Sequence, residues 1–179
     1  MNIYRSLFFI ISLAILSVTF SISKAEPLKL NMVFVPASEK GDDQDYVSLI
    51  KIIEELTGIE ITPIRVTDYN AAVEAVRANR AQIAWYGGKT YIQAVEIANV
   101  EAFAAGVRKG DTDASYFAYF VVRADSDLKT LADVKGKKLA LNSIGSTSGD
   151  LIPQVELVKN ALSVKNKDDF QNVHYAGSH

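Results

Sequence analysis

The chain lacks cysteine and has only two histidines, His174 and His179, among its 179 residues. The absence of cysteine excludes disulfides, thiolate metal sites and a cysteine nucleophile. Two histidines are too few for a histidine-rich metal site. A basic excess is also missing, because 19 Lys and Arg face 21 Asp and Glu, for a formal net charge of -2. Without that excess few phosphates could be neutralised, so the composition argues against a nucleic-acid partner.

An apolar run stands at the N-terminus. Residues 1–5 carry one positive charge, residues 7–22 are almost wholly apolar or hydroxylic, and Ser23-Lys24-Ala25 follows with small residues at both ends. This pattern is typical of a cleaved secretory signal peptide. We expect residues 1–25 to be removed near Ala25 and the product to be periplasmic, with a retained membrane anchor as the alternative. The run is short for a spanning helix, which needs about 20 apolar residues.

Removal of residues 1–25 leaves 154 residues with 17 basic and 21 acidic side chains, a net charge of about -4. Their first half alternates strand-like and helix-like patterns. We predict strands over 28–35, 59–66, 82–86 and 101–108, and helices over 45–57, 69–79 and 90–98. Gly58 is suited to end the first helix and Asp68 to cap the second. Such alternation indicates an α/β fold with a mostly parallel sheet and helices on both faces.

Ligands of open parallel sheets bind beyond the carboxyl ends of the strands. Thr67-Asp68-Tyr69 and Tyr86-Gly87-Gly88 directly follow the second and third predicted strands. A phenol there donates to an anion without bringing charge, although a single tyrosine is more often a half-buried packing residue. We expect Trp85 in the core, because it precedes Tyr86 on the opposite strand face.

The second half contains fewer elements. We predict strands over 116–123, 138–142 and 173–176, a short helical turn over 131–134, and a helix over 150–162. From about residue 124 onward this amounts to two strands and one full helix. So thin a sheet buries little core.

The sharpest local signal is the loop Gly145-Ser146-Thr147-Ser148-Gly149 between a strand and a helix. Three hydroxyls and several N–H groups at a helix N-terminus favour an oxyanion by roughly 0.3–2 kcal/mol. A plain N-cap turn, which needs only one hydroxyl, is the alternative. The loop is neither a nucleotide P-loop, since no Lys follows Gly149, nor a nucleophile elbow.

No catalytic set emerges from the sequence. Ser146 and Ser148 are possible nucleophiles, but no Lys or carboxylate has the spacing to activate them. His174, inside a predicted strand, is expected to be structural, and a lone terminal histidine such as His179 is usually solvated. We expect no enzymatic activity, no cofactor and no metal.

Five segments in order resemble one known family. They are Val66–Tyr69, Ile83–Ala94, Leu131–Lys137, Ser146–Gly149 with Pro153, and Tyr175–His179. Together they are similar to the phosphonate, phosphite and phosphate-type periplasmic solute-binding proteins of ABC transporters. The resemblance implies a two-lobe α/β fold that closes on its ligand about a hinge.

The resemblance also implies roles for individual residues. Tyr69 and Tyr86 would hydrogen-bond a bound oxyanion from lobe one. Ser146, Thr147 and Ser148 would surround it from lobe two, and His179 would reach it from the end of the last strand. Gly87, which lets the backbone come close, and Thr90 are weaker candidates.

Boundaries follow from the same resemblance: residues 1–25 signal peptide, 26–115 lobe one, 116–124 a crossover or hinge strand, and 125–179 a partial lobe two. Family members are nearly twice as long as the mature chain, so we expect lobe one nearly complete and lobe two partial, in a chain truncated at its C-terminus. Alternatives are a fragment of a longer protein or a truncated product that binds nothing.

The implied partners are a small oxyanion and an ABC permease and ATPase complex, with no nucleic acid and no stable membrane insertion after signal cleavage. The sequence Gly88-Lys89-Thr90 with Gln93 resembles a subgroup assigned to phosphonate, phosphite or other oxyanions, which leaves the ligand open. A sensory module of the same fold is the first alternative function. An exported enzyme acting on phosphate esters is disfavoured, because the metal-ligand or nucleophile–base set that it needs is not found.

Overall fold

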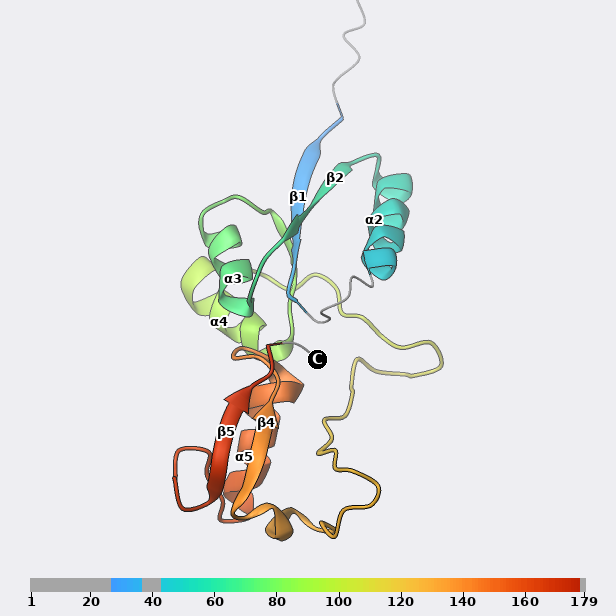
Figure 1. The fold of residues 1–179 in the computed structure, drawn as a ribbon. Helices are drawn as coiled ribbons and strands as arrows, with labels where there is room; N and C mark the ends of the chain where they lie inside the picture. The colour runs from blue at the N-terminus through green and yellow to red at the C-terminus, as the bar shows by residue number, and fades with distance from the viewer. Residues whose placement is uncertain (1–26, 37–42, 178–179) are drawn as a thin grey trace, which may run out of the picture.

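The computed structural model describes residues 27–36 and 43–177, so the expected signal peptide lies outside the described residues. The described chain forms two lobes, one above the other in Figure 1. A long irregular stretch, residues 99–130, runs from the upper lobe to the lower one along one side. We call it the connecting segment.

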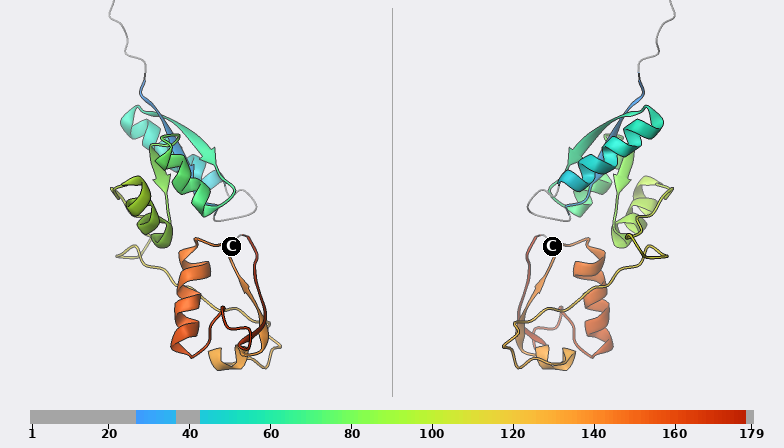
Figure 2. Two further views of the ribbon diagram at one scale, coloured as in Figure 1. Left: turned by 90° about the vertical axis from the view of Figure 1, so that its left-hand side faces the viewer. Right: turned by 90° about the vertical axis from the view of Figure 1, so that its right-hand side faces the viewer.

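Lobe one is built on a parallel sheet. Strand β1 (Lys29–Phe34) lies between β2 (Glu60–Arg65) and β3 (Ile83–Trp85), and both neighbours run parallel to it. Helix α2 (Asp43–Thr57) covers one face, while α3 (Tyr69–Arg77) and α4 (Gly88–Ala98) lie on the other (Figures 1 and 2). The predicted parallel α/β arrangement is confirmed for these strands and helices.

The last three residues of the central strand β1, Met32–Phe34, are buried on both faces of the sheet. Met32 and Phe34 pack towards α2, in a cluster with Ile50, whereas Val33 and Val35 pack towards α3, in a cluster with Ala72. A strand covered on both sides needs apolar residues at successive positions, since neighbouring side chains point to opposite faces. This explains the unbroken apolar run at the end of the first predicted strand.

Two predicted helix boundaries are correct. Gly58 follows α2 with a φ of +70°, a left-handed conformation that glycine adopts without steric cost. The Asp68 carboxylate accepts a hydrogen bond from the Ala71 N–H at 2.8 Å and caps α3. The cap places Tyr69 at the first position of α3, at the carboxyl end of β2.

Lobe two contains two parallel strands, β4 (Lys137–Leu141) and β5 (Phe170–Tyr175), and helix α5 (Ile152–Lys159). A short η1 turn (Leu131–Val134) precedes β4, and a π-helical turn, η2 (Thr147–Leu151), leads into α5. Leu157, Leu162 and Phe170 form its small core. The expected thin lobe is confirmed, but its helical stretch begins at Thr147 and α5 ends at Lys159.

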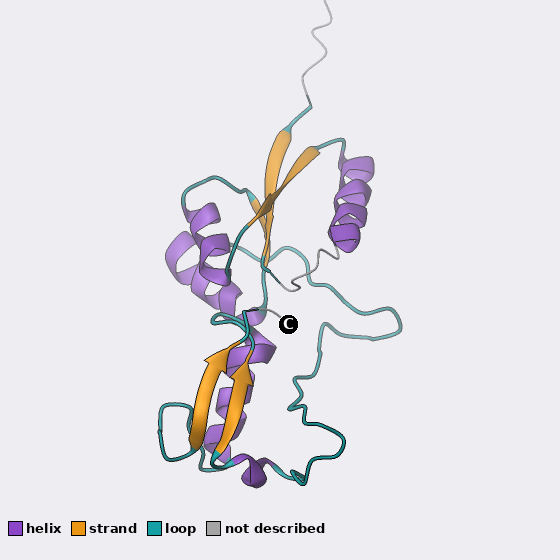
Figure 3. Cartoon of the chain, in the orientation of Figure 1, coloured by secondary structure: helices purple, strands orange, loops and turns teal. Residues whose placement is uncertain are grey.

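The strands predicted over 101–108 and 116–123, and with them the crossover strand at 116–124, are wrong. The whole connecting segment is irregular, as Figure 3 shows in teal. The reason is that a strand must share its N–H and C=O groups with a neighbouring strand. No strand of the described residues pairs with this segment. Its apolar side chains are consequently exposed, and Val121 retains 87% of its accessible surface.

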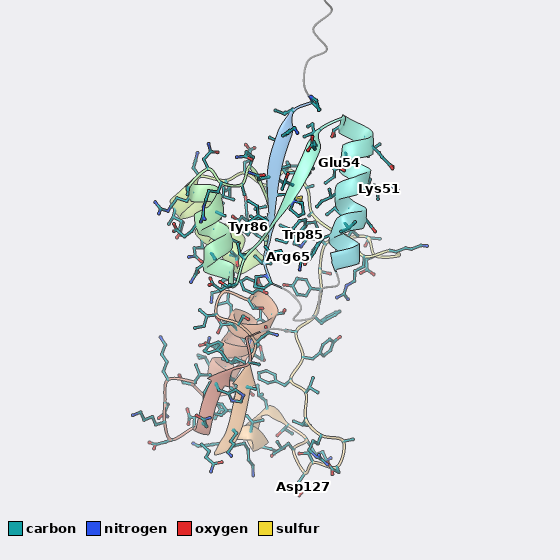
Figure 4. All side chains as sticks on the ribbon, turned by 45° about the horizontal axis from the view of Figure 1, so that its top comes forward. Lys51, Glu54, Arg65, Trp85, Tyr86 and Asp127 are labelled. Atoms are coloured by element: carbon teal, nitrogen blue, oxygen red, sulfur yellow. The ribbon has the colours of Figure 1, made fainter. Side chains whose placement is uncertain are left out.

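Trp85 is a further correction, because it is exposed rather than part of the core. It ends the edge strand β3, and its ring lies against Gly106 of the connecting segment. In Figure 4, Trp85 lies on the α2 side of the sheet and Tyr86 on the α3 side. The alternation was therefore correct, but the core on the α2 side takes in Ile83 at the start of the edge strand and leaves Trp85 at its end exposed.

Candidate functional site at the lobe junction

Three helical segments begin at the place where the two lobes meet. Helix α3 begins at Tyr69, α4 begins at Gly88, and η2 begins at Thr147 of lobe two. A Cβ on Gly145 would lie 2.6 Å from the Cβ of Tyr69, and one on Gly87 would lie 3.0 Å from the Thr147 Oγ1. We call this contact region the lobe junction. Helix N-termini carry partial positive charge and present N–H donors, so the lobe junction favours anions.

Tyr69 and Ser146 join the lobes through their side chains. Both are nearly fully buried, with 3% and 1% of their surfaces exposed, and a hydrogen bond links the two hydroxyls. Burial raises the pKa of Tyr69, and the hydrogen bond from Ser146 offsets only part of that rise. The phenol therefore stays protonated and uncharged at neutral pH.

The Ser146 hydroxyl also caps a helix, which was the alternative role considered for this loop. Its Oγ accepts a hydrogen bond from the Gly149 N–H at 3.0 Å, so Ser146 is the N-cap of η2. Capping and contact with Tyr69 use the same hydroxyl. The N-cap interpretation is thus correct for Ser146, but it does not account for the pairing with lobe one.

The first residues of α4 form hydrogen bonds to the loop at residues 145–149. The Lys89 N–H donates to the Thr147 Oγ1 at 2.9 Å, and the buried Thr90 Oγ1 donates to the Gly145 carbonyl at 2.9 Å. Both bonds cross the lobe junction. The N-cap of α4 is Gly87, which has no side chain to cap the helix, so Thr147 supplies a hydroxyl from the other lobe instead.

Two glycines of the loop are required by their surroundings. Gly145 has a φ of +101° and lies against Tyr69, and a Cβ on Gly149 would come within 2.2 Å of the Asn142 Cβ. Neither position has room for a side chain. These close approaches bring the loop against α3 and against the end of β4.

The remaining predicted residues are placed differently. The half-buried Tyr86 donates its hydroxyl proton to the Ala72 carbonyl at 3.2 Å, and burial raises its pKa to about 12. In this arrangement its proton is engaged within lobe one, beside the apolar cluster behind α3. Ser148 is half-buried in η2, and His179 lies outside the described residues. The roles of Tyr86, Ser148 and His179 as ligand contacts stay predictions.

A charged group at the lobe junction was not expected from the sequence. The Asp150 carboxylate, 2% exposed as a residue, accepts hydrogen bonds from the Lys89 ammonium, from the Tyr175 hydroxyl at 2.8 Å and from Gln154. Burial disfavours its charged form, but the bonds from Lys89 and Tyr175 outweigh this and hold the pKa of Asp150 below its usual value. The pKa of Tyr175 is raised to about 12, by burial first and by Asp150 second.

Only a weak signal in the sequence could have indicated this group. Asp150 directly follows the loop, and Lys89 lies within the Gly-Gly-Lys-Thr segment that follows Tyr86. Nothing in the linear order pairs two residues 61 positions apart. The described residues contain no group of three or more His, Cys, Asp or Glu arranged to hold a metal ion.

The chain belongs to the family of ABC transporter, phosphonate, periplasmic substrate-binding proteins, whose model matches residues 32–179. It is 30% identical over 139 residues to the phosphate-import protein PhnD of Mycolicibacterium smegmatis, covering 76% of this chain and 43% of that protein. It is also 29% identical over 145 residues to the phosphonates-binding periplasmic protein of Escherichia coli, covering 78% of this chain and 42% of that protein.

Solved structures share the fold. A binding protein component of an ABC phosphonate transporter from Pseudomonas aeruginosa superposes with a TM-score of 0.74 at 24% identity, over 86% of this chain and 52% of that one. PhnD1 from Prochlorococcus marinus, in complex with methylphosphonate, gives a TM-score of 0.67 at 22% identity, over 86% and 57%. The two-lobe fold of periplasmic binding proteins is thereby confirmed. The chain spans a little under half the length of the curated relatives that it matches.

Across the described residues, no helix combines the length and the apolar character needed to cross a membrane. The family is one of periplasmic proteins.

Proposed function

We propose that the chain is an extracytoplasmic solute-binding protein that captures a phosphonate, phosphite, phosphate or similar oxyanion for uptake by an ABC permease and ATPase. The observation that carries this proposal is the meeting of the Tyr69 and Ser146 hydroxyls between the starts of α3, α4 and η2. Names of the relatives support the same ligand class, since one is a phosphate importer and one was crystallised with methylphosphonate.

The chemistry of the lobe junction suits a small oxyanion. Hydroxyl and N–H groups come from both lobes. The Tyr69 hydroxyl is bonded to the Ser146 hydroxyl, and the Lys89 N–H donates to the Thr147 Oγ1. An oxyanion inserted there would accept the same protons, and bonds to a charged acceptor are stronger than bonds between neutral groups. Each lobe would then bind one side of the ligand, so closure would stabilise the bound state.

Binding without chemical conversion is part of the proposal. Ser146 is bonded to a phenol that stays protonated and to a backbone N–H, so no base removes its proton. A serine without such a base is a weak nucleophile. We further propose that lobe one spans residues 26–115 and partial lobe two residues 125–179, with 116–124 as an irregular crossover between them, and that residues 1–25 direct export and are cleaved near Ala25.

Titration calorimetry of residues 26–179 with methylphosphonate, phosphite and phosphate tests the proposal. At least one of the three should bind, and the double variant Ser146→Ala/Thr147→Ala should bind it about 1–3 kcal/mol more weakly, because charge-assisted hydrogen bonds are lost. The matched control is Ser115→Ala/Thr112→Ala in the exposed connecting segment, which should bind like the parent. Absence of heat with all three anions from the folded parent would contradict the proposal.

A further inference from the structure

We propose that Lys89 and Asp150 form an ionic latch between the lobes, which favours the closed state and sets how long a ligand stays bound. The second part rests on the proposed function, whereas the first part concerns the protein alone. This pair crosses from one lobe to the other. Further ion pairs each stay within one part of the molecule: Lys29–Glu60, Lys51–Glu55 and Arg77–Glu74 in lobe one, Arg123–Asp125 in the connecting segment, and Lys135–Asp169 and Lys159–Glu156 in lobe two.

The first argument is the burial of the pair. The side chain of Asp150 is 3% exposed and that of Lys89 30% exposed, whereas the ion pairs Lys29–Glu60 and Lys51–Glu55 lie at the surface. Exposed pairs contribute little, because water and salt screen them. A buried carboxylate that loses its cation is much more costly than an exposed one. Separation of the lobes must remove Lys89 from Asp150, so this cost opposes opening.

The second argument is that the latch can be released without damage to lobe two. Asp150 keeps two partners from its own lobe, the Tyr175 hydroxyl at 2.8 Å and the Gln154 amide. These bonds hold the carboxylate in one orientation whether or not Lys89 is present. Lys89 is part-exposed in lobe one and can return to water. The closed state is therefore lower in free energy, and the open state stays accessible.

The third argument is the position of the latch beside the candidate site. Lys89 binds lobe two twice, through its ammonium to Asp150 and through its N–H to the Thr147 Oγ1. The next residue, Thr90, donates to the Gly145 carbonyl. One turn of α4 thus contacts lobe two at three places, two in the loop and one at Asp150, so the latch closes at the same time as the hydroxyls of the loop reach lobe one.

The absence of cysteine makes a direct test possible, because two introduced cysteines can be spin-labelled selectively. We place them at Glu96 on α4 and Val158 on α5, both exposed and one in each lobe. Pulsed electron spin resonance then reports the distance between the lobes without added ligand. The test variant is Lys89→Met, which keeps most of the side-chain length and removes the charge. The control is Lys51→Met, which removes an exposed pair within α2.

Lys89→Met should shift the distance distribution away from that of the parent and broaden it, and Lys51→Met should leave it unchanged. Dissociation of methylphosphonate, followed by stopped flow, should be about tenfold or more faster in Lys89→Met and within about twofold of the parent in Lys51→Met. Lys89→Gln serves as a second variant, should Lys89→Met not fold. A distance distribution in Lys89→Met or Lys89→Gln equal to that of the parent would overturn the latch.

The two proposals fail in different ways. If the lobes separate in Lys89→Met but no oxyanion binds the parent, the latch stands and the proposed function fails. If the parent binds methylphosphonate and both Lys89 variants keep the parent's lobe distance and dissociation rate, the proposed function stands and the latch fails.

Discussion

The lobe junction and the connecting segment differ in whether their side chains and backbone groups have partners within the described chain. At the lobe junction, polar groups from residues far apart in the sequence are buried and bonded to each other, as Thr90 is to Gly145 and Lys89 to Thr147. In the connecting segment, apolar side chains such as Val121 and Tyr119 are exposed and its backbone pairs with no strand of the described residues. A strand or loop pattern in the sequence forms the expected structure only where the chain also provides the residues that pack against it.

The same difference explains which predicted secondary-structure elements are correct and which are wrong. The loop at residues 145–149 contacts α3, α4 and Asn142, the residue after β4, all within the described chain. The run at residues 116–123 has a strong strand pattern but no neighbouring strand among the described residues. The same substitution made once in the lobe junction or core and once in the connecting segment tests this difference.

The largest contrast is expected between two glycines with nearly equal φ angles. Gly145 and Gly110 have φ angles of +101° and +97°, but a Cβ meets Tyr69 at 2.6 Å in the first case and nothing within 4 Å in the second. Gly145→Ala should lower the free energy of unfolding by about 2–5 kcal/mol, from left-handed strain and overpacking together. Gly110→Ala should lose no more than the strain, about 1–2 kcal/mol. Urea denaturation measures both, and equal losses would contradict the close contact of the lobes.

Next in size is the buried hydroxyl of Thr90. Thr90→Val keeps the shape of the side chain and leaves the Gly145 carbonyl without its donor, which should cost about 1–3 kcal/mol of stability. The same exchange at the exposed Thr112 should change stability by less than about 0.5 kcal/mol. Thermal unfolding of the two variants compares them, and a neutral Thr90→Val would show that the bond across the lobe junction contributes nothing.

The helix cap beside the lobe junction should have a smaller effect. Asp68→Ala removes the acceptor of the Ala71 N–H and should cost about 0.5–2 kcal/mol, typically about 1 kcal/mol. Asp68→Asn keeps an acceptor and should recover most of that loss. Urea denaturation of both variants checks the order, and an alanine variant as stable as the asparagine variant would contradict the cap.

The smallest effect is expected in the connecting segment. Val121→Thr exchanges a side chain that is 87% exposed and should alter the free energy of unfolding by less than about 0.5 kcal/mol. The same exchange at the fully buried Val33 places an extra hydroxyl in the core of lobe one and should cost about 1–3 kcal/mol. A large loss in Val121→Thr, measured by urea denaturation, would mean that the connecting segment packs against a surface after all.

Most of lobe one was predictable because its signals are local. The Asp68 cap, the stop at Gly58 and the unbroken apolar run of β1 each depend on a few consecutive residues. Tyr69 and Ser146 could be nominated for the same reason, since Tyr69 begins α3 and Ser146 is the N-cap of η2. Their hydrogen bond to each other could not be derived, because it depends on how the lobes approach.

Two kinds of error remain, and both concern partners distant in sequence. The pairing of Lys89 with Asp150 spans 61 positions and leaves no periodic pattern. The strands predicted in the connecting segment failed for the opposite reason, because the pattern was present and the partner strand was not. Trp85 was misplaced for a similar reason. Alternation along a strand predicts which face of the sheet a side chain lies on, but not whether other residues cover that face.

The central claim is that an oxyanion binds at the lobe junction, and a titration followed by amide NMR tests it most directly. Methylphosphonate added to the ¹⁵N-labelled chain should produce saturable shifts at the amides of Lys89, Thr147 and Gly149, while amides of the connecting segment such as Val121 stay in place. Shifts that are absent at the lobe junction, or equally large in the connecting segment, would contradict the claim.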